Sequence, residues 1–205
     1  QSFVLKEKKI SDQINEQNKK IDSNESKIKE IINENEKKAV ISNVIQYPNG
    51  IFEFLRSKST GNICDSNIID VETSAILSGE SKNLFDKSKT THIKLSNRSN
   101  VYIIIDFKDK KVCFSKYNFS VPSEGYSSGR PKSWQIDCSN DKSSWELIDI
   151  KHDDSSLNSY GKSNTFMCKN ITNKFYRYIK ISEIISQDNN HYFLLSEIEF
   201  YGSIE

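Results

Sequence analysis

Three histidines, His92, His152 and His191, are the side chains best suited to move a proton near neutral pH. None of them lies in an H-E-x-x-H zinc helix, and the sequence contains no G-x-S-x-G nucleophile motif and no glycine-rich phosphate loop. His152 is followed by two aspartates and then by Ser155 and Ser156, which is typical of a solvated turn. These residues predict that the protein is not an enzyme.

Cysteine is the other residue type with distinctive chemistry. The four cysteines, Cys64, Cys113, Cys138 and Cys168, are widely separated and form no C-x-x-C pair, so the pattern does not favour a zinc site. Cys113 and Cys138 fall in predicted strands, where a free thiol packs as a small apolar side chain. We therefore predict four reduced thiols and a cytoplasmic, intracellular protein.

Composition narrows the class of partner. Lys and Arg number 29 against 28 Asp and Glu, so no basic field is available for binding nucleic acid. The longest apolar run, Val101–Ile105, is far too short to span a membrane. Because the chain begins at Gln1, we expect it to be a fragment of a longer protein. No charged segment leads into an apolar one here, so we expect no signal peptide in this sequence.

Residues 1–40 carry a heptad pattern. Between Lys6 and Lys38 there is no Gly, Pro or aromatic residue, and isoleucines recur at spacings of 4, 7, 7 and 3, which fit the a and d positions of a heptad. So narrow an apolar stripe cannot stabilise an isolated helix, so we predict a parallel coiled coil that makes the protein a homo-oligomer. The alternative is a solvated linker helix, or one packed on its own domain, and the number of strands stays open. The predicted oligomerisation residues are Ile10, Ile14, Ile21, Asn24, Ile28 and Ile31.

A change in composition follows a linker at residues 41–49, which ends in the turn signal Pro48-Asn49-Gly50. From residue 50 to 205, short β-branched and aromatic runs alternate with turn-rich stretches, which predicts an all-β sandwich or barrel. Trp134 and Trp145 alternate with apolar neighbours and are predicted to be core residues. The expected strands are 101–107, 112–119, 133–138, 145–150, 165–168, 175–181 and 192–201.

The loops at one end of such a sandwich are the expected binding surface, because strands form the rigid frame. The candidate loops are 57–65, 86–91, 123–130 and 187–191, and they contribute Asp65, Tyr126, Arg130 and His191 as ligand-binding candidates. Tyr126 and Arg130 combine an aromatic face with a fork of donors, which could stack on a sugar ring or grip a carboxylate. Alternatively, Tyr126 covers the end of the sandwich and Arg130 points into water.

Three segments in order resemble a known family. Arg130–Ile148, with Trp134, Ile136 and a Ser-Asn-Asp turn followed by Trp145, is similar to the central motif of discoidin (coagulation factor type C) domains. Residues 175–181 resemble that family's Arg-Tyr-Ile-Arg strand, and residues 195–202 resemble its terminal strand. The resemblance implies a jelly-roll β-sandwich of the galactose-binding-like class. Residues 50–65 resemble a subgroup of intracellular protist proteins in which a BTB-like region and a coiled coil precede the discoidin domain.

The resemblance also implies where a metal would be bound. Many relatives hold a structural calcium ion with an acidic loop and a glutamate on the last strand, and the matching positions here are Asp86 and Glu197. The loop departs from the pattern, because Asp86 is followed by Lys87 and Lys89 and Ca²⁺ favours several carboxylates. We therefore expect no cofactor and leave calcium as an open alternative.

These observations predict a non-enzymatic binding and assembly module. The coiled coil would set the number of copies, and the sandwich would bind a partner, expected to be a protein, through its end loops. One alternative is a lectin-like carbohydrate-binding protein, a possibility that rests on analogy with the fold. A further alternative is a structural component of the cytoskeleton.

Overall fold

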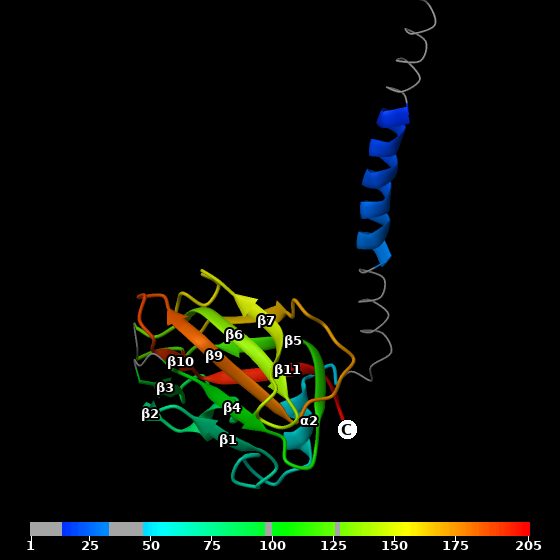
Figure 1. Ribbon diagram of the computed structural model, residues 1–205. Coiled ribbons are helices and arrows are strands. Elements are labelled where there is room, and N and C mark those ends of the chain that lie inside the picture. The colour runs from blue at the N-terminus through cyan, green and yellow to red at the C-terminus, as the bar shows by residue number, and fades with distance from the viewer. Residues whose placement is uncertain (1–13, 33–46, 97–99, 126–127) are drawn as a thin grey trace, which may run out of the picture. The chain divides into compact units, whose positions relative to one another are not determined.

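A computed structural model describes residues 14–32, 47–96, 100–125 and 128–205 (Figure 1). The chain divides into two compact units, Gln1–Asn43 and Val44–Glu205. Within the described residues, no helix combines the length and the apolar character that crossing a bilayer would require.

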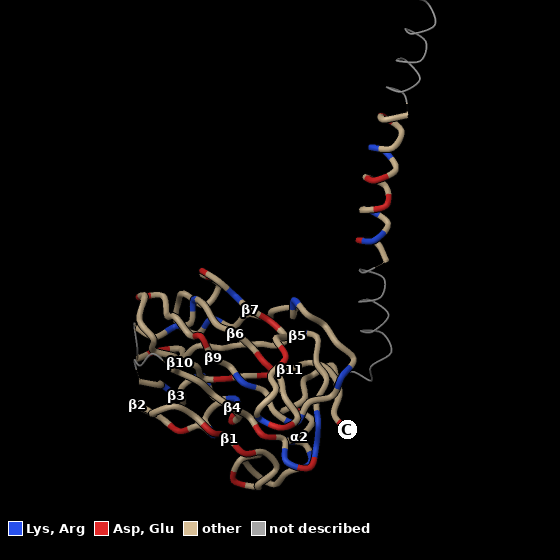
Figure 2. Tube along the Cα trace, in the orientation of Figure 1, with Lys and Arg blue, Asp and Glu red and all other residues tan. Residues whose placement is uncertain are grey.

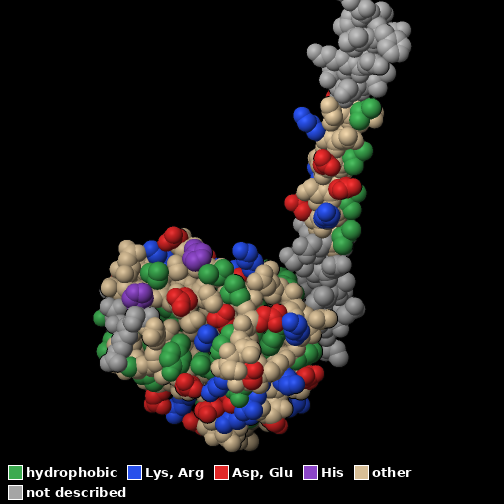
Figure 3. Space-filling view, viewed as in Figure 1, with side chains coloured by type: hydrophobic (Ala, Val, Ile, Leu, Met, Phe, Trp, Pro, Cys, Tyr) green, Lys and Arg blue, Asp and Glu red, His purple; other side chains and the backbone are tan. Residues whose placement is uncertain are grey.

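The first unit contains a helix over residues 14–32. Its sequence lacks helix breakers, and Lys20 pairs with Glu16 one turn away, at 2.8 Å. The isoleucines gather on one side of this helix (Figure 3) and remain half exposed, between 51% for Ile32 and 57% for Ile31. Ile10 lies outside the described residues, so the helix confirms the helical prediction for residues 14–32, whereas pairing with a second copy stays a prediction.

The second unit is a β-sandwich, as predicted. One layer is a five-stranded antiparallel sheet in the order β1-β4-β9-β6-β7. Two three-stranded sheets, β10-β3-β2 and β11-β5-β8, complete the fold (Figure 1). The bounds are β1 Asp70–Thr73, β2 Ile76–Gly79, β3 Ile93–Leu95, β4 Ile103–Asp106, β5 Val112–Ser120, β6 Pro131–Ser139, β7 Glu146–Lys151, β8 Ser163–Met167, β9 Tyr178–Ser186, β10 Phe193–Leu195 and β11 Glu197–Ile204.

The seven predicted strands are confirmed, with the last one divided into β10 and β11 at Ser196. Three strands were not predicted, β1, β2 and β3, and they are only three or four residues long. The helix α2, Ile51–Ser57, and the 3₁₀ helix η1, Ser81–Phe85, were not predicted either. These elements are too short to display a period of their own.

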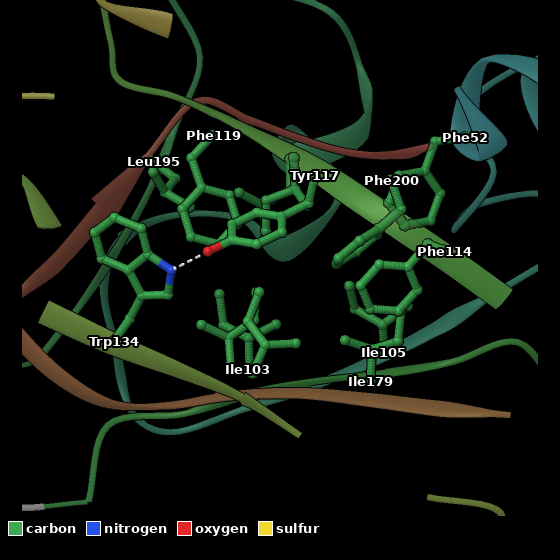
Figure 4. Packing of buried hydrophobic residues seen from close by; sticks show 14 of the residues in the cluster. Phe52, Ile103, Ile105, Phe114, Tyr117, Phe119, Trp134, Ile179, Leu195 and Phe200 are labelled. Carbon is green, nitrogen blue, oxygen red and sulfur yellow. Dashed lines mark hydrogen bonds between the residues drawn. The ribbon is translucent and has the colours of Figure 1, made fainter. Parts of the chain in front are cut away.

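Aromatic side chains fill the space between the layers (Figure 4). Trp134 is 1% exposed and packs against Phe119 and Phe166, which confirms that it is a core residue. Trp145 is not a core residue, contrary to prediction. It is only half buried, and the Lys180 ammonium lies 4.5 Å from the centre of its ring. The turn 140–145 precedes β7, so Trp145 does not follow the inward alternation of the strand.

A chain of hydrogen bonds satisfies the polar atoms of this core. The Trp134 indole donates to the Tyr117 hydroxyl at 2.8 Å (Figure 4), and Tyr117 donates to Asp149 at 2.7 Å. Lys151 contacts both carboxylate oxygens of the fully buried Asp149, Oδ2 at 2.8 Å and Oδ1 at 3.1 Å. Burial, followed by the neighbouring Asp149 charge, raises the pKa of Tyr117 far above its ordinary value, so the hydroxyl stays a donor.

A glutamate from the last strand fixes α2 to the sandwich. The Glu199 carboxylate accepts hydrogen bonds from the backbone N–H groups of Phe52 at 2.8 Å and Glu53 at 3.0 Å, and Arg56 approaches to 3.4 Å. These are the donors that a helix leaves unpaired at its start. Gly50 has φ of 107°, and a Cβ there would lie 2.2 Å from Glu199 Cδ, so only glycine fits.

The two ends of the sandwich differ in what they carry. Tyr47 N donates to Gly202 O, and Glu205 N donates to Lys111 O, so the chain enters and leaves at the same end. The strands β5, β7 and β9 finish at the opposite end, where their connections to β6, β8 and β10 begin. The loops at that end therefore lie away from the end at which the chain enters and leaves the sandwich.

Candidate functional site

Three loops and one preceding segment meet at this far end. They are the β5–β6 loop 121–130, the β7–β8 loop 152–162, the β9–β10 loop 187–192 and the segment 86–92 before β3. Backbone hydrogen bonds join them: Gln187 N to Arg130 O, Gly161 N to Pro122 O and Ser123 N to Lys89 O, each at 2.8 Å. The described part of each loop is therefore held in position by its neighbours.

A close backbone approach brings two of these loops together. Leu194 N donates to Gly129 O at 2.8 Å. Gly129 has φ of 95°, and a Cβ there would lie 3.2 Å from Tyr192 Cβ and 3.3 Å from Leu194 Cβ. A side chain at this position would be strained and crowded, so glycine allows Arg130 to lie against the β9–β10 loop.

Arg130 adjoins an exposed tyrosine. Its guanidinium carbon lies 5.4 Å from the centre of the Tyr160 ring, and Tyr160 is 49% exposed. An arginine beside an aromatic face combines planar hydrogen-bond donors with an apolar surface. Such an arrangement can stack against a sugar ring and donate to its hydroxyl or carboxylate oxygens.

Further polar groups border this pair. Lys132 donates to Asn189 at 2.6 Å and pairs with Asp153 at 3.1 Å, so it links two of the loops. Lys94 donates to Ser128 at 3.0 Å and lies 4.8 Å from the centre of the Tyr192 ring. The surroundings of Arg130 therefore present donors, acceptors and rings within one group of loops.

An acid in the β9–β10 loop stabilises the loop itself. Burial alone would raise the pKa of Asp188, but hydrogen bonds from Ser186 and Asn190 outweigh it, and the pKa lies below its ordinary value. Gly129 N also donates to Asp188, at 3.4 Å. The Asp188 carboxylate therefore links the β5–β6 loop to the β9–β10 loop by hydrogen bonds.

The structure brings together two of the four predicted ligand-binding residues. His191 lies in the loop that is bonded to the Arg130 segment, and its Nδ1 is 3.0 Å from Ile184 O. Asp65 lies apart, in the segment between α2 and β1, and faces Lys82 at 3.7 Å. Tyr126 is outside the described residues.

The residue that sequence reasoning missed is Tyr160. Its loop, 152–162, was not among the four candidates, because the adjacent His152-Asp153-Asp154 segment reads as an ordinary turn. The signal was a single tyrosine between Ser159 and a glycine, Gly161, that adopts φ of 66°. Its proximity to Arg130, thirty positions earlier, appears only in the folded chain.

The donor set for calcium fits poorly. Both carboxylate oxygens of Asp86 accept hydrogen bonds within their own loop, from Ser88 N at 2.8 Å and Thr91 Oγ1 at 2.7 Å. Glu197 lies at the start of β11, opposite Ser120. Across the described residues, no three His, Cys, Asp or Glu side chains are arranged to hold a metal ion. Calcium, which favours several carboxylates, does not match these residues.

Comparison with known proteins places the fold. No family model and no curated sequence matches the chain. Among solved structures, CpGH89CBM32-5 from Clostridium perfringens, in complex with GalNAc-β-1,3-galactose, aligns with a TM-score of 0.53 and 12% identity, over 65% of this chain and 95% of that one. The C-terminal domain of a Bacteroides fragilis chitobiase aligns with a TM-score of 0.51 and 17% identity, over 67% and 95% of the two chains.

A third similar structure, truncated AlyQ with CBM32 and alginate lyase domains, aligns with a TM-score of 0.51 and 18% identity, over 66% of this chain and 33% of that one. At these identities the likeness concerns the fold. The second unit therefore has the galactose-binding-like jelly-roll fold that CBM32 modules share with discoidin domains, and the predicted fold class is confirmed.

Proposed function

We propose that this chain is a non-catalytic carbohydrate-binding protein, whose sandwich binds glycans through the loops around Arg130 and Tyr160 and whose N-terminal helix joins several copies. The half-exposed Tyr160 ring beside the Arg130 guanidinium carries the proposal. A ring face matches the C–H face of a sugar, and the guanidinium donors match its oxygens.

The comparisons favour a carbohydrate over a protein as the ligand. CpGH89CBM32-5 was solved with a disaccharide, and AlyQ carries a CBM32 domain beside an alginate lyase domain. Analogy of fold does not identify a ligand by itself. The pairing of the Tyr160 ring with the Arg130 guanidinium in this chain is the second observation that supports a carbohydrate ligand.

A protein ligand is the second candidate, and one observation favours it. β2 is an edge strand of its sheet, and its first two residues, Ile76 and Leu77, are 45% and 56% exposed. Exposed edges accept an added strand from another chain. If a protein partner adds a strand to β2, Leu77→Lys would abolish binding of that partner and leave the binding of sugars to this chain unchanged.

Self-association through the helix is the second part of the proposal. Ile14, Ile21, Ile28 and Ile31 are each more than half exposed in the single chain, and burying them in a coiled coil would be favourable. Because weak single sites gain overall affinity when copies are linked, oligomerisation would strengthen binding to a surface with many glycans.

The cellular setting is also a proposal. All four cysteines are free, and burial raises the pKa of Cys64 to about 12, so this thiol is unreactive. This is consistent with the reducing interior of a cell. The resemblance of residues 50–65 to intracellular proteins with a BTB-like region points the same way.

Isothermal titration with GalNAc-β-1,3-galactose, together with a glycan array, tests the proposal. We expect saturable binding to at least one glycan, lost in Tyr160→Ala and in Arg130→Ala. Tyr160→Phe keeps the ring and should bind normally, so it is the matched control. Binding that survives both alanine substitutions would move the site elsewhere, and failure to bind any glycan would reject carbohydrate as the ligand.

A further inference from the structure

The outer face of the five-stranded sheet carries a second group of polar residues. Mixed charges of both signs cover the sandwich in this view (Figure 2). Several of these charged side chains form ion pairs with each other. Arg177 donates two hydrogen bonds to Asp106, of 2.7 and 2.9 Å, and Lys142 pairs with Glu72 at 2.9 Å. Where the polar groups of a face are already paired, a ligand has little to gain there.

A cavity of about 210 Å³ interrupts this paired surface. Residues from β4, β9 and the segment before β4 line it, among them Asn100, Tyr102, Ile104, Lys180, Ser182 and Glu183. Among the described residues, the side chains of Asn100, Ser182 and Glu183 have no hydrogen-bond or ion-pair partner. The cavity therefore concentrates unused polar groups in one place.

The backbone presents Glu183 in an unusual way. Its φ is 52°, a left-handed conformation that costs energy for a residue with a side chain. The register between β6 and β9 shifts at this point, between the pairs Ser133–Ile185 and Gln135–Ser182. Such a bulge redirects a side chain, and Glu183 is among the residues that line the cavity.

We propose that this cavity binds one neutral, hydroxylated ring, that is, a sugar residue, separately from the Arg130–Tyr160 site. Glu183 would accept hydrogen bonds from two hydroxyls, whereas Ser182 and Asn100 both donate and accept. Ile104 and the Tyr102 ring supply apolar surface for the C–H face. Glu183 disfavours an anion, Lys180 disfavours a cation, and an apolar ligand would leave the polar groups unpaired.

The position of the cavity relates it to the loop site. His191 Nδ1 lies 3.0 Å from the carbonyl of Ile184, the residue after Glu183, so the strand that lines the cavity also contacts the β9–β10 loop. The inference rests on the proposed function only in assuming that the chain meets glycans. It adds a second subsite, so that one sandwich engages more than one sugar residue.

Amide chemical shifts in the complete chain test this inference. The probes are galactose, N-acetylgalactosamine, glucose and mannose, titrated singly. We expect at least one sugar to shift the amides of Lys180, Ser182 and Glu183 saturably, in addition to those around Arg130 and Tyr160. Glu183→Gln should weaken the response of the Lys180, Ser182 and Glu183 amides about tenfold and leave the response around Arg130 and Tyr160 unchanged. The reason is that hydrogen bonds to a charged carboxylate are replaced by weaker bonds to a neutral amide.

The control is Asp109→Asn, an exposed carboxylate in the turn between β4 and β5. If the Arg130 and Tyr160 amides respond and the Glu183 amides do not respond to any sugar, the inference is wrong and the proposed function stands. If only the Glu183 amides respond, the inference stands and the loop site is wrong. A response to lysine in place of the sugars would show a cation site and overturn the inference.

Discussion

At the scale of single residues, the proposed recognition depends on two side chains, Arg130 and Tyr160, brought together from loops thirty positions apart. Arg130→Lys is the sharpest test of the donor geometry, since it keeps the charge but removes the planar fork. We predict that Arg130→Lys weakens glycan binding about tenfold, as measured by isothermal titration. Equal affinity in the two proteins would mean that only the charge of Arg130 contributes.

The buried Tyr117 hydroxyl makes a second prediction at this scale. Tyr117→Phe would leave Asp149 without one of its donors and the Trp134 indole without its acceptor. We expect the free energy of unfolding to fall by about 1–3 kcal/mol in urea denaturation, because buried polar atoms would lose their partners. Tyr160→Phe, at an exposed tyrosine, should change stability by less than about 0.5 kcal/mol.

At the scale of elements, Glu199 couples α2 to β11 and makes stability depend on pH. Burial raises the pKa of Glu199 to about 7 from 4.5, although the N–H groups of Phe52, Glu53 and Phe200, together with Arg56, oppose the shift. Because the folded protein holds this proton more tightly than the unfolded chain does, the contribution is fully present below pH 4.5 and is lost as the pH rises through about 7.

Glu199→Gln tests this coupling. The stability of wild type relative to Glu199→Gln should fall by about 3 kcal/mol between pH 4 and pH 8, measured by chemical denaturation. Taking the difference between the two proteins cancels the opposite slope from carboxylates such as Asp106, whose pKa is lowered. A flat difference between wild type and Glu199→Gln across this pH range would contradict the assigned cause.

The elements also show how far the sequence predicts this fold. Long β-branched and aromatic runs such as 112–119 and 175–181 identify strands, because burial on one or both faces selects those residues. The helix α2 has only seven residues, and its cap, Glu199, lies 146 positions from Glu53, so no local pattern reveals it. Trp145 was misjudged because the Lys180 ammonium that covers its ring comes from β9.

The candidate site was predictable in part. Turn-rich segments between strands locate Arg130 and His191 in loops, and the fold brings those loops together. The partner of Arg130, Tyr160, and the bulge at Glu183 depend on contacts between distant strands, which a single sequence does not display. The sequence alone does not show which distant residues come into contact when the strands pair.

At the scale of the whole molecule, the exposed isoleucine stripe predicts self-association. Ile14→Asn, Ile21→Asn and Ile28→Asn combined should reduce the mass measured by light scattering to that of one chain. The matched control, Lys19→Asn with Ser26→Asn, changes the outward heptad positions and should leave the oligomer intact. If the wild-type protein is already monomeric by light scattering, the prediction of a coiled coil is wrong.

The central claim is that the loop end around Arg130 and Tyr160 binds a glycan. A glycan array probed with the wild-type chain and with the combined variant Arg130→Ala and Tyr160→Ala tests it most directly. We predict saturable binding of the wild type to at least one glycan and its loss in the variant, with the far-ultraviolet circular dichroism unchanged. Equal binding by both proteins, or no binding by the wild type, would contradict the claim.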